Sequence, residues 1–271
     1  MLANLSRRGI LVVYAIIVLV PLTIVIFGSF KSTAELFNDP FTLPSSFAPT
    51  NYQEVLTGGD LGNAFLNSTI VALISVPATL FIASLAAYAL SRIPGFFSWL
   101  IFGFLVLGMA IPAQTNMIAL YVLFGQLGLL NSLAGLILAN IVGTMPIAVF
   151  ILTGFMKTIP QQLFEASSID GTGPWRTYRS IVIPLSAPSL AAAGIFLAVI
   201  HWNELLYPLL FIQSPDMRTL PLALLSFQGE YQTNYPALFA SVMLASAPIV
   251  IAYVFLQRYF VAGITAGATK G

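Results

Sequence analysis

The sequence predicts an all-α membrane protein with six transmembrane helices. Its 271 residues are 58% hydrophobic and only 7% charged, whereas about a quarter of the residues in a soluble domain carry charge. So little polar surface cannot cover a soluble particle, and lipid must therefore cover the rest. Six apolar runs are long enough to cross a bilayer, which takes about 20 helical residues. The predicted spans cover residues 10–30, 65–90, 97–120, 133–156, 181–206 and 237–261.

The first run follows Arg7 and Arg8, as the apolar part of a signal peptide would. It is about 21 residues long, however, whereas the apolar region of a signal peptide has about 7–15 residues. No A-x-A cleavage site follows it. We therefore expect residues 10–30 to be a retained span.

The basic residues predict the orientation, because cytoplasmic loops of membrane proteins carry an excess of Lys and Arg. With the N-terminus inside, only Lys31 and Arg218 fall on the outer side. Both termini are then expected in the cytoplasm, as six spans require. The other basic residues fall inside: Arg7, Arg8, Arg92, Lys157, Arg176, Arg179, Arg258 and Lys270.

Polar residues gather between the fourth and fifth predicted spans, in the segment 158–188. We predict a short helix here, with Thr158 and Gln161 as a capping box and Gly171 as its C-terminal stop. Glu165 and Asp170 give this helix its charge. Its apolar stripe at helical spacing could enter a groove on another protein. That stripe consists of Leu163, Ala166 and Ile169.

A second short helix is predicted to follow, with Thr172 as its cap and Pro174 in its first turn. Arg176 and Arg179 come next, and Pro184 and Pro188 stand at the entry of the fifth span. The residues alone leave an alternative open. The whole segment could be an amphipathic connector on the inner membrane surface, with both arginines on lipid headgroups.

The order of residues in this segment resembles the EAA loop of ABC importer permeases. Ser167 and Thr172 stand where alanine is usual in that loop, and Tyr178 stands where phenylalanine is usual. The motif is long, and it lies in the inner loop before the fifth of six spans. It reads Glu165-Ala166-Ser167, Asp170-Gly171-Thr172, Tyr178, Ile181, Pro184 and Pro188.

The resemblance covers nearly the whole chain and is to the carbohydrate-importer branch, in particular to the smaller, maltose-permease-like subunit. Short runs along the sequence carry it. They are Ser29-Phe30-Lys31, Asn51-Tyr52, Asn67-Ser68, Ala87-Tyr88-Ala89-Leu90-Ser91-Arg92 with Pro94-Gly95, Trp202-Asn203-Glu204 with Pro208-Leu209, and Thr219-Leu220-Pro221.

This resemblance implies a type I permease fold in a prokaryotic cell membrane. Residues 1–271 would form one transmembrane domain, with an extra N-terminal span at 10–30, core spans within 65–262 and a coupling segment at 158–188. The coupling helix would dock on an ATPase and transmit its closure to the membrane. The residues that we expect to serve this coupling are Glu165, Ala166, Ser167, Asp170, Gly171, Arg176 and Pro184.

The partners that the resemblance implies are a second, homologous permease, two cytoplasmic ATPase subunits and an extracytoplasmic solute-binding protein. The complex would move a sugar or sugar-like solute inward by alternating access. The sequence has no G-x-x-x-x-G-K-[ST] phosphate loop, so ATP and Mg are expected on the ATPases and no cofactor in this chain. We expect no enzymatic activity, metal site or nucleic-acid partner.

A neutral sugar needs a path of amides, hydroxyls and aromatic faces rather than fixed charges. Polar groups within membrane bundles also join helices without touching a solute, so each candidate has a structural alternative. Glu204 is expected near the outer end of its span, where it could be hydrated or pair with Arg218. The candidate pathway residues are Asn67, Gln114, Asn116, Asn140, Trp202, Asn203 and Glu204.

Two other classes of function remain as alternatives. An ion- or proton-coupled secondary transporter would favour ionisable residues at the midplane and paired inverted repeats, and neither is evident. A membrane enzyme would need a cluster of nucleophilic, acid–base or metal-binding residues. With His201 as its only histidine and no cysteine, the sequence offers no such cluster.

Overall fold

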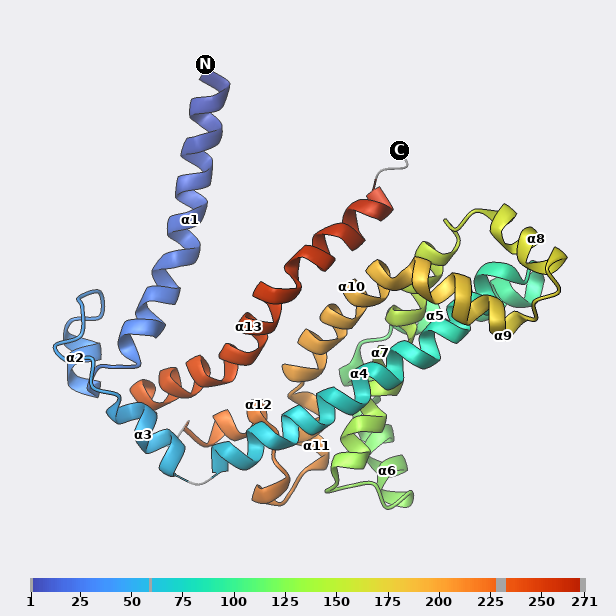
Figure 1. Ribbon diagram of the computed structural model, residues 1–271. Coiled ribbons are helices and arrows are strands. Elements are labelled where there is room, and N and C mark those ends of the chain that lie inside the picture. Colours follow the sequence, from blue (N-terminus) through green and yellow to red (C-terminus); the bar gives the residue numbers. More distant parts are fainter. Residues whose placement is uncertain (1, 59, 228–232, 269–271) are drawn as a thin grey trace. The chain divides into compact units, whose positions relative to one another are not determined.

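The computed structural model describes residues 2–58, 60–227 and 233–268, and the elements in this part of the chain are helices (Figure 1). The predicted all-α class is confirmed. Contacts divide the chain into two compact units, which are described separately. Unit 1 comprises Met1–Phe65 and Thr219–Pro248, and unit 2 comprises Leu66–Arg218 and Ile249–Gly271. The single domain over residues 1–271 stays a prediction.

Unit 1 is built from two separate parts of the chain, one around the first predicted span and one that leads into the last. The two longest helices that contribute to it, α4 and α13, each begin in unit 1 and continue in unit 2. Its elements are α1 (Leu2–Gly28), α2 (Thr33–Asn38), α3 (Thr50–Thr57), the start of α4 (Asp60–Arg92), α12 (Leu220–Leu224), η4 (Leu225–Phe227) and the first part of α13 (Tyr235–Ala268).

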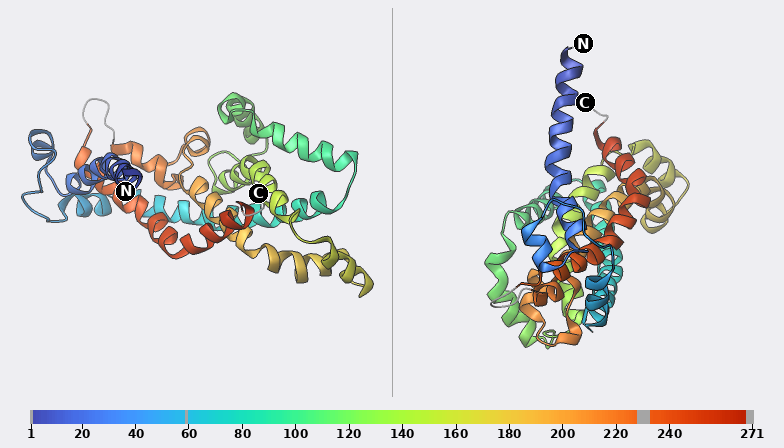
Figure 2. Two further views of the ribbon diagram at one scale, coloured as in Figure 1. Left: turned by 90° about the horizontal axis from the view of Figure 1, so that it is seen from above. Right: turned by 90° about the vertical axis from the view of Figure 1, so that its left-hand side faces the viewer.

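Helix α1 touches the rest of unit 1 at its C-terminal end. Its apolar side chains from Ile10 to Val20 are exposed, and in Figures 1 and 2 most of the helix extends away from the other elements of the unit. Near its end, a Cβ on Gly28 would lie 2.7 Å from the Phe239 ring. Glycine therefore permits the close approach of α1 to α13.

A polar cluster ties the end of α1 to the segment that follows it. Lys31 is 1% exposed, and its Nζ donates to the carbonyl oxygen of Asp39 at 2.6 Å. The amide Nδ2 of Asn51 donates to the carbonyl oxygens of Ser29 and Lys31, at 2.9 and 3.0 Å. The Ser29 hydroxyl lies 2.8 Å from the hydroxyl of Tyr52. Two of the runs singled out in the sequence thus serve local structure.

Unit 2 holds the larger buried core, where the middle helices of the chain pack together. Small residues of α4, such as Ala83 and Ala87, are fully buried against α7 and α10 side chains such as Leu152 and Leu197. The elements of the unit are the rest of α4, α5 (Phe96–Met109), η1 (Ala113–Asn116), α6 (Met117–Gln126), α7 (Leu133–Met156), α8 (Gln161–Ile169), α9 (Pro174–Thr177), η2 (Tyr178–Val182), α10 (Ile183–Trp202), α11 (Leu206–Phe211), η3 (Pro215–Met217) and the end of α13.

Five helical stretches of the described residues are long and apolar enough to cross a membrane, and a bent pair makes a sixth if it is counted as one span. The five agree in position with the first, second, fourth, fifth and sixth predicted spans. They are Arg7–Gly28, Leu61–Arg92, Leu133–Met156, Pro174–Phe211 and Tyr235–Phe255.

The third predicted span, 97–120, is wrong as one continuous helix. Helix α5 ends at Met109, and the chain turns through η1 into α6, so that the two apolar helices are bent by 89°. Pro112 adopts an extended conformation, with ψ 132°, at the break. A proline has no N–H to donate and its ring clashes with the preceding turn of a helix, which explains why the helix stops here.

The fifth predicted span, 181–206, is longer than expected. Helix α9 opens at Pro174 as predicted, but it is not a separate short helix, because it runs through the π-turn η2 into α10. Within that turn the N–H of Ile183 donates to the carbonyl oxygen of Tyr178, five residues back. Pro184, the next residue, has no N–H to donate to a carbonyl oxygen of the preceding turn. The wider π-turn before it accommodates this missing helical hydrogen bond.

Candidate functional site

Helix α8 begins at Gln161, directly after Pro160, whose ψ of 135° is extended. The predicted capping box is wrong. The Thr158 hydroxyl donates instead to the carbonyl oxygen of Phe155, at 2.8 Å, in the last turn of α7. The extended proline separates Thr158 from the new helix, so its side chain serves the helix that ends rather than the one that begins.

The exit from α8 agrees with the prediction at Gly171, which has a φ of +70°. Its N–H donates to the carbonyl oxygen of Ser168, and the N–H of Thr172 donates to that of Ser167, both at 3.1 Å. These two bonds form a Schellman motif, which needs a left-handed residue at this position. Thr172 does not cap α9, because the residue at that N-cap is Gly173.

The hydroxyl of Thr172 instead joins a small cluster beneath α8. It donates to the carbonyl oxygen of Ser167 at 2.8 Å and lies 3.1 Å from the hydroxyl of Thr177. The hydroxyls of Ser167 and Thr177 lie 2.7 Å apart, and those of Ser167 and Thr172 are also hydrogen-bonded. The cluster fastens both ends of the exit turn to the first turn of α9.

Helix α8 has one buried and one exposed face. Phe164 and Ser167 face inward and are buried. The predicted apolar stripe lies on the exposed side: Ile169 is 87% exposed and Leu163 is 40% exposed, and Ala166 is also exposed. An apolar stripe on the open side of a short, firmly held helix suits contact with another molecule.

The remaining coupling candidates are placed as follows. Glu165 and Asp170 are exposed on α8 and at its end, next to the stripe. Arg176 is exposed on α9, and Pro184 is exposed near the start of α10. The structure thus gathers five of the seven candidates, Glu165, Ala166, Ser167, Asp170 and Gly171, on α8 and its exit turn.

Arg92, at the end of α4, is a contact of α8 that the sequence analysis missed. Its guanidinium carbon lies 3.6 Å from the centroid of the Phe164 ring. Its Nη2 donates to the carbonyl oxygens of Met156 and Ile159, at 2.5 and 3.3 Å, and its Nη1 donates to Gln161 Oε1 at 3.3 Å. The only sequence signal was its place in the family-like run 87–92.

These contacts line a hollow beneath α8 in unit 2. In Figure 1, α8 lies beside the C-terminal end of α4 and close to α9. The walls of the hollow come from α4, α8 and the start of α9. Its lining residues are Tyr88, Arg92, Gln161, Phe164, Ser168, Thr172, Pro174 and Thr177.

Three of the candidate pathway residues make side-chain hydrogen bonds to backbone groups of the chain. Asn67 donates to the carbonyl oxygens of Asp216 and Arg218, at 2.8 and 2.9 Å. Asn203 donates to Val199 O at 2.8 Å. The Glu204 carboxylate accepts the N–H groups of Leu206 and Tyr207, at 2.8 and 3.2 Å, and so caps α11. Each of these side chains therefore has a structural task.

The other pathway candidates are scattered. Gln114 and Asn116 are exposed in η1, at the break between α5 and α6. Trp202 is buried at the end of α10. Asn140 is 3% exposed on α7, and its Oδ1 is buried with no hydrogen-bond partner among the described residues. The structure does not gather the candidates into one site.

His201 joins three helices of unit 2. Its Nδ1 lies 2.7 Å from the hydroxyl of Ser75 on α4, and its Nε2 lies 3.0 Å from the hydroxyl of Thr144 on α7. The side chain is buried, so these bonds satisfy both ring nitrogens away from water. The arrangement is that of a histidine that holds helices together.

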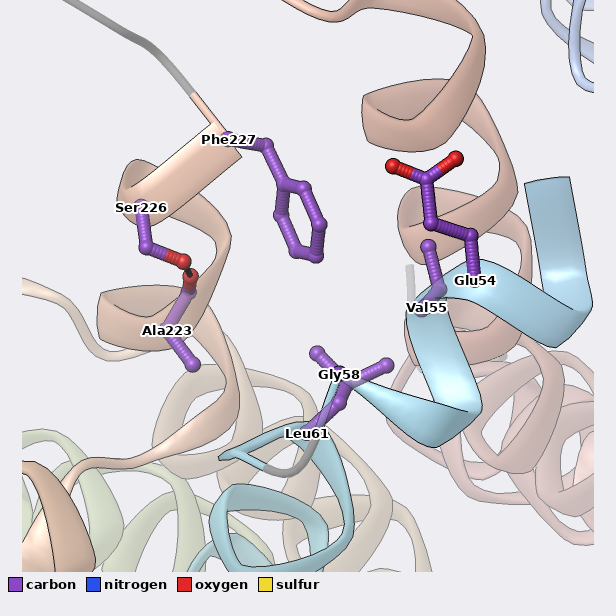
Figure 3. Close-up of a pocket in the computed structure, with 7 residues that line it drawn as sticks. All are labelled: Glu54, Val55, Gly58, Leu61, Ala223, Ser226 and Phe227. Atoms are coloured by element: carbon purple, nitrogen blue, oxygen red, sulfur yellow. Dashed lines mark hydrogen bonds between the residues drawn. The ribbon is translucent and has the colours of Figure 1, made fainter.

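A second hollow lies in unit 1, between α3 and the α12–η4 turn (Figure 3). Figure 3 shows the Phe227 ring on one side of it and Glu54 on the other. The Ser226 hydroxyl is already donated to the carbonyl oxygen of Ala223, at 2.6 Å. None of the candidate pathway residues lines this hollow.

Residues 79–266 match the family described as "Binding-protein-dependent transport system inner membrane component". Among curated proteins, the chain is 36% identical to the arabinooligosaccharides transport system permease AraQ of Halalkalibacterium halodurans, over 95% of this chain and 93% of that protein. It is 34% identical to the multiple sugar-binding transport system permease MsmG of Streptococcus mutans, over 96% and 95%.

A solved structure has the same fold. It is that of a bacterial ABC transporter involved in the import of the acidic polysaccharide alginate, with a TM-score of 0.84 and 20% identity over 96% of both chains. The fold of the chain is therefore that of an ABC importer permease.

Proposed function

The chain belongs to the family of inner-membrane components of binding-protein-dependent transport systems, and from this premise we propose that it is the permease subunit of an ATP-driven sugar importer. The protein is a multi-pass membrane protein and a transport subunit. In the proposed mechanism it takes the solute from a binding protein and passes it to the cytoplasm by alternating access.

The proposed mechanism rests on one observation about α8: one face of this short helix is held to the rest of unit 2, and the opposite face exposes an apolar stripe. Phe164 and Ser167 hold α8 from below, and Leu163 and Ile169 remain exposed above. Because α8 lies outside the predicted membrane spans, its exposed apolar side chains are not expected to face lipid. Together with the neighbouring charged residues, they could bind in a groove on a partner protein. We propose that this groove belongs to an ATPase subunit and that Glu165 and Asp170 meet basic groups at its rim.

The energy for transport would come from partner subunits. Two ATPases bind ATP and Mg, and a second, homologous permease completes the pathway across the membrane. Movement of the ATPases would displace α8 and, through it, the core of unit 2. This chain contributes the docking surface and part of the pathway, and it holds no cofactor of its own.

The names of the relatives support a carbohydrate as the solute. AraQ and MsmG are permeases of systems for arabinooligosaccharides and for multiple sugars. A sugar is also compatible with a chain of which only 7% is charged, because amides and hydroxyls can replace the water around a neutral solute. The second permease shares the pathway in this proposal, since the polar candidates of this chain do not form one site.

The orientation that we propose places both termini and α8 in the cytoplasm, and the segments 31–62 and 208–236 outside. The excess of Lys and Arg on one side of the predicted spans supports it. On this arrangement the outer segments meet the solute-binding protein. Residues 1–271 act as one transmembrane domain of a prokaryotic cell membrane.

The alternative of an ion- or proton-coupled secondary transporter is not favoured. Membership of a binding-protein-dependent family supports the ATP-driven mechanism instead. His201, the only histidine in the sequence, has both ring nitrogens within hydrogen-bond distance of hydroxyls in the core.

The proposed function is tested by purifying the chain with the subunits encoded beside its gene. The ATPase rate of the reconstituted complex is measured with the binding protein and a panel of oligosaccharides, monosaccharides, polyols and amino acids. We expect ATPase subunits to co-purify and a sugar to raise the rate. Absence of a bound ATPase would contradict the importer, and stimulation by amino acids alone would contradict the sugar class.

A further inference from the structure

One face of α4 contacts the coupling segment over three successive helical turns. Ser84, Tyr88 and Arg92 are spaced four residues apart and so lie on one side of the helix. We call these three residues the α4 stripe. Ser84 and Tyr88 both contact Tyr178 in the π-turn, and Tyr88 and Arg92 both contact Phe164 on α8.

The first contact of the α4 stripe is to the π-turn. The hydroxyls of Ser84 and Tyr178 lie 2.7 Å apart, and both side chains are buried. At position 178 the resembling motif usually has phenylalanine, so the tyrosine hydroxyl is a departure from that motif. The bond joins α4 to the start of the fifth span.

The second contact is aromatic. The Tyr88 ring lies 5.7 Å from that of Tyr178 and 6.4 Å from that of Phe164, measured between centroids. Trp175 also stacks on Tyr178, with 5.3 Å between the ring centroids. Tyr88 therefore lies between α8 and the π-turn and packs against both. Offset aromatic contacts of this kind are favourable and directional.

The third contact is made by Arg92, which holds the beginning of α8 to the end of α7. Its guanidinium covers the Phe164 ring and donates to the Met156 and Ile159 carbonyl oxygens. A cation at the C-terminal end of a helix also interacts favourably with the helix dipole. Displacement of α8 must therefore break the Arg92 contacts or move the end of α4 with it.

We propose that the α4 stripe of Ser84, Tyr88 and Arg92 is the surface through which displacement of α8 reaches the second membrane span. The three residues position α8 and transmit its movement, and they do not touch the solute. This inference rests on the proposed function, because it assumes that α8 is the helix that a partner moves. It adds a defined route to α4, besides the covalent connections of α8 to α7 and α9.

The test uses the complete complex in liposomes and measures sugar uptake and ATP hydrolysis together. The readout is the amount of sugar moved per ATP hydrolysed, because a purely structural defect lowers the amount of complex but not this ratio. For Arg92→Gln we expect the ratio to fall about threefold or more, with normal ATPase co-purification. Arg92→Lys keeps the charge without the planar fork and should restore the ratio in part.

The matched control is Lys157→Gln. Like the Arg92 guanidinium, which comes from α4, the Lys157 side chain places a positive charge near the C-terminal end of α7. Its Nζ, however, lies 5.2 Å from the centroid of the Phe102 ring of α5. We expect the ratio of this variant to equal that of the wild type.

A wild-type ratio in an assembled Arg92→Gln complex overturns the inference. If Arg92→Gln does not assemble, Ser84→Ala decides the question, because it removes the hydrogen bond from the α4 stripe to Tyr178 and keeps the aromatic contact of Tyr88 with Tyr178. A lowered ratio is then expected, and an unchanged ratio overturns the inference. Failure of the proposed function itself looks different: the wild-type complex then shows no ATP-dependent uptake at all.

Discussion

The amide nitrogen of Thr172 lies 3.1 Å from the carbonyl oxygen of Ser167. This bond closes the end of α8 across Gly171, whose φ of +70° is disfavoured for any residue with a side chain. The polar segment that stood out in the sequence is thus a helix with a fixed exit. The left-handed backbone of Gly171 and the hydroxyl cluster of Ser167, Thr172 and Thr177 together set the direction in which the chain leaves the helix.

Gly171→Val should disrupt coupling. No atom lies within 4 Å of the position a Cβ would take, so the cost comes from the left-handed backbone, about 1–2 kcal/mol, with more for a β-branched residue. We expect the exit turn to change and ATPase co-purification or uptake to fall. Sugar uptake and the amount of bound ATPase are the measurements.

Gly173→Ala is the control for that variant. Gly173 is two residues away and equally unobstructed, but its φ is −74°, so alanine fits. It should behave as the wild type. Equal uptake by Gly171→Val and Gly173→Ala, with normal ATPase binding, would show that the left-handed turn is not needed.

His201→Ala should lower stability rather than alter transport. The substitution removes two buried hydrogen bonds between three helices and leaves a cavity, a loss of about 2–4 kcal/mol. We expect a lower melting temperature in detergent, and a smaller decrease for His201→Gln, whose amide can replace one bond. Uptake per folded complex should match the wild type from pH 6 to 8. A changed pH profile in His201→Gln would instead indicate a role in proton transfer.

Substitutions of Glu204 can distinguish its role as the cap of α11 from a role in contacting the solute. Glu204→Gln keeps an oxygen that can accept the N–H groups of Leu206 and Tyr207, so uptake and stability should change little. Glu204→Ala removes the cap and should cost about 1 kcal/mol of stability. The check is thermal unfolding together with the uptake KM. A raised KM in Glu204→Gln, at unchanged stability, would mark the carboxylate as a solute contact.

The orientation can be tested with single cysteines, because the chain has none of its own. Phe41 and Ile169 are 75% and 87% exposed, and the proposed topology places them on opposite sides of the membrane. A membrane-impermeant maleimide should label Phe41→Cys in right-side-out vesicles and Ile169→Cys in inverted vesicles that lack the ATPase subunits, which would otherwise cover α8. The reverse pattern would place α8 outside the cell and contradict the topology.

The sequence predicted those features that depend on neighbouring residues. The fourth span was predicted at 133–156 from its apolar run alone, and the structure has α7 there, with Ser132 accepting the N–H of Gly135 as its N-cap. The stop at Gly171 was likewise predicted from a local signal, a glycine at the end of the helix. Conversely, the capping box at Thr158 failed because an extended Pro160 intervenes, and the third span broke at Pro112.

The role of Arg92 could not be predicted in this way. Its partners Met156 and Phe164 are 64 and 72 positions further along the chain, and only the packing of α4 against α7 brings them together. The same holds for Asn67, whose partners are 149 and 151 positions further along the chain, whereas Glu204 bonds N–H groups only 2 and 3 positions away. Both residues look like polar groups on a solute path in the sequence. In the structure they hold backbone groups in place.

The central claim, that α8 docks on an ATPase, is tested most directly by attaching a photoreactive benzophenone to Ile169→Cys in the assembled complex. Phe41→Cys serves as the control. After illumination, we predict a covalent product between this chain and the ATPase subunit from position 169 and none from position 41. An Ile169 probe that never reaches the ATPase, in a complex that still transports sugar, would contradict the account.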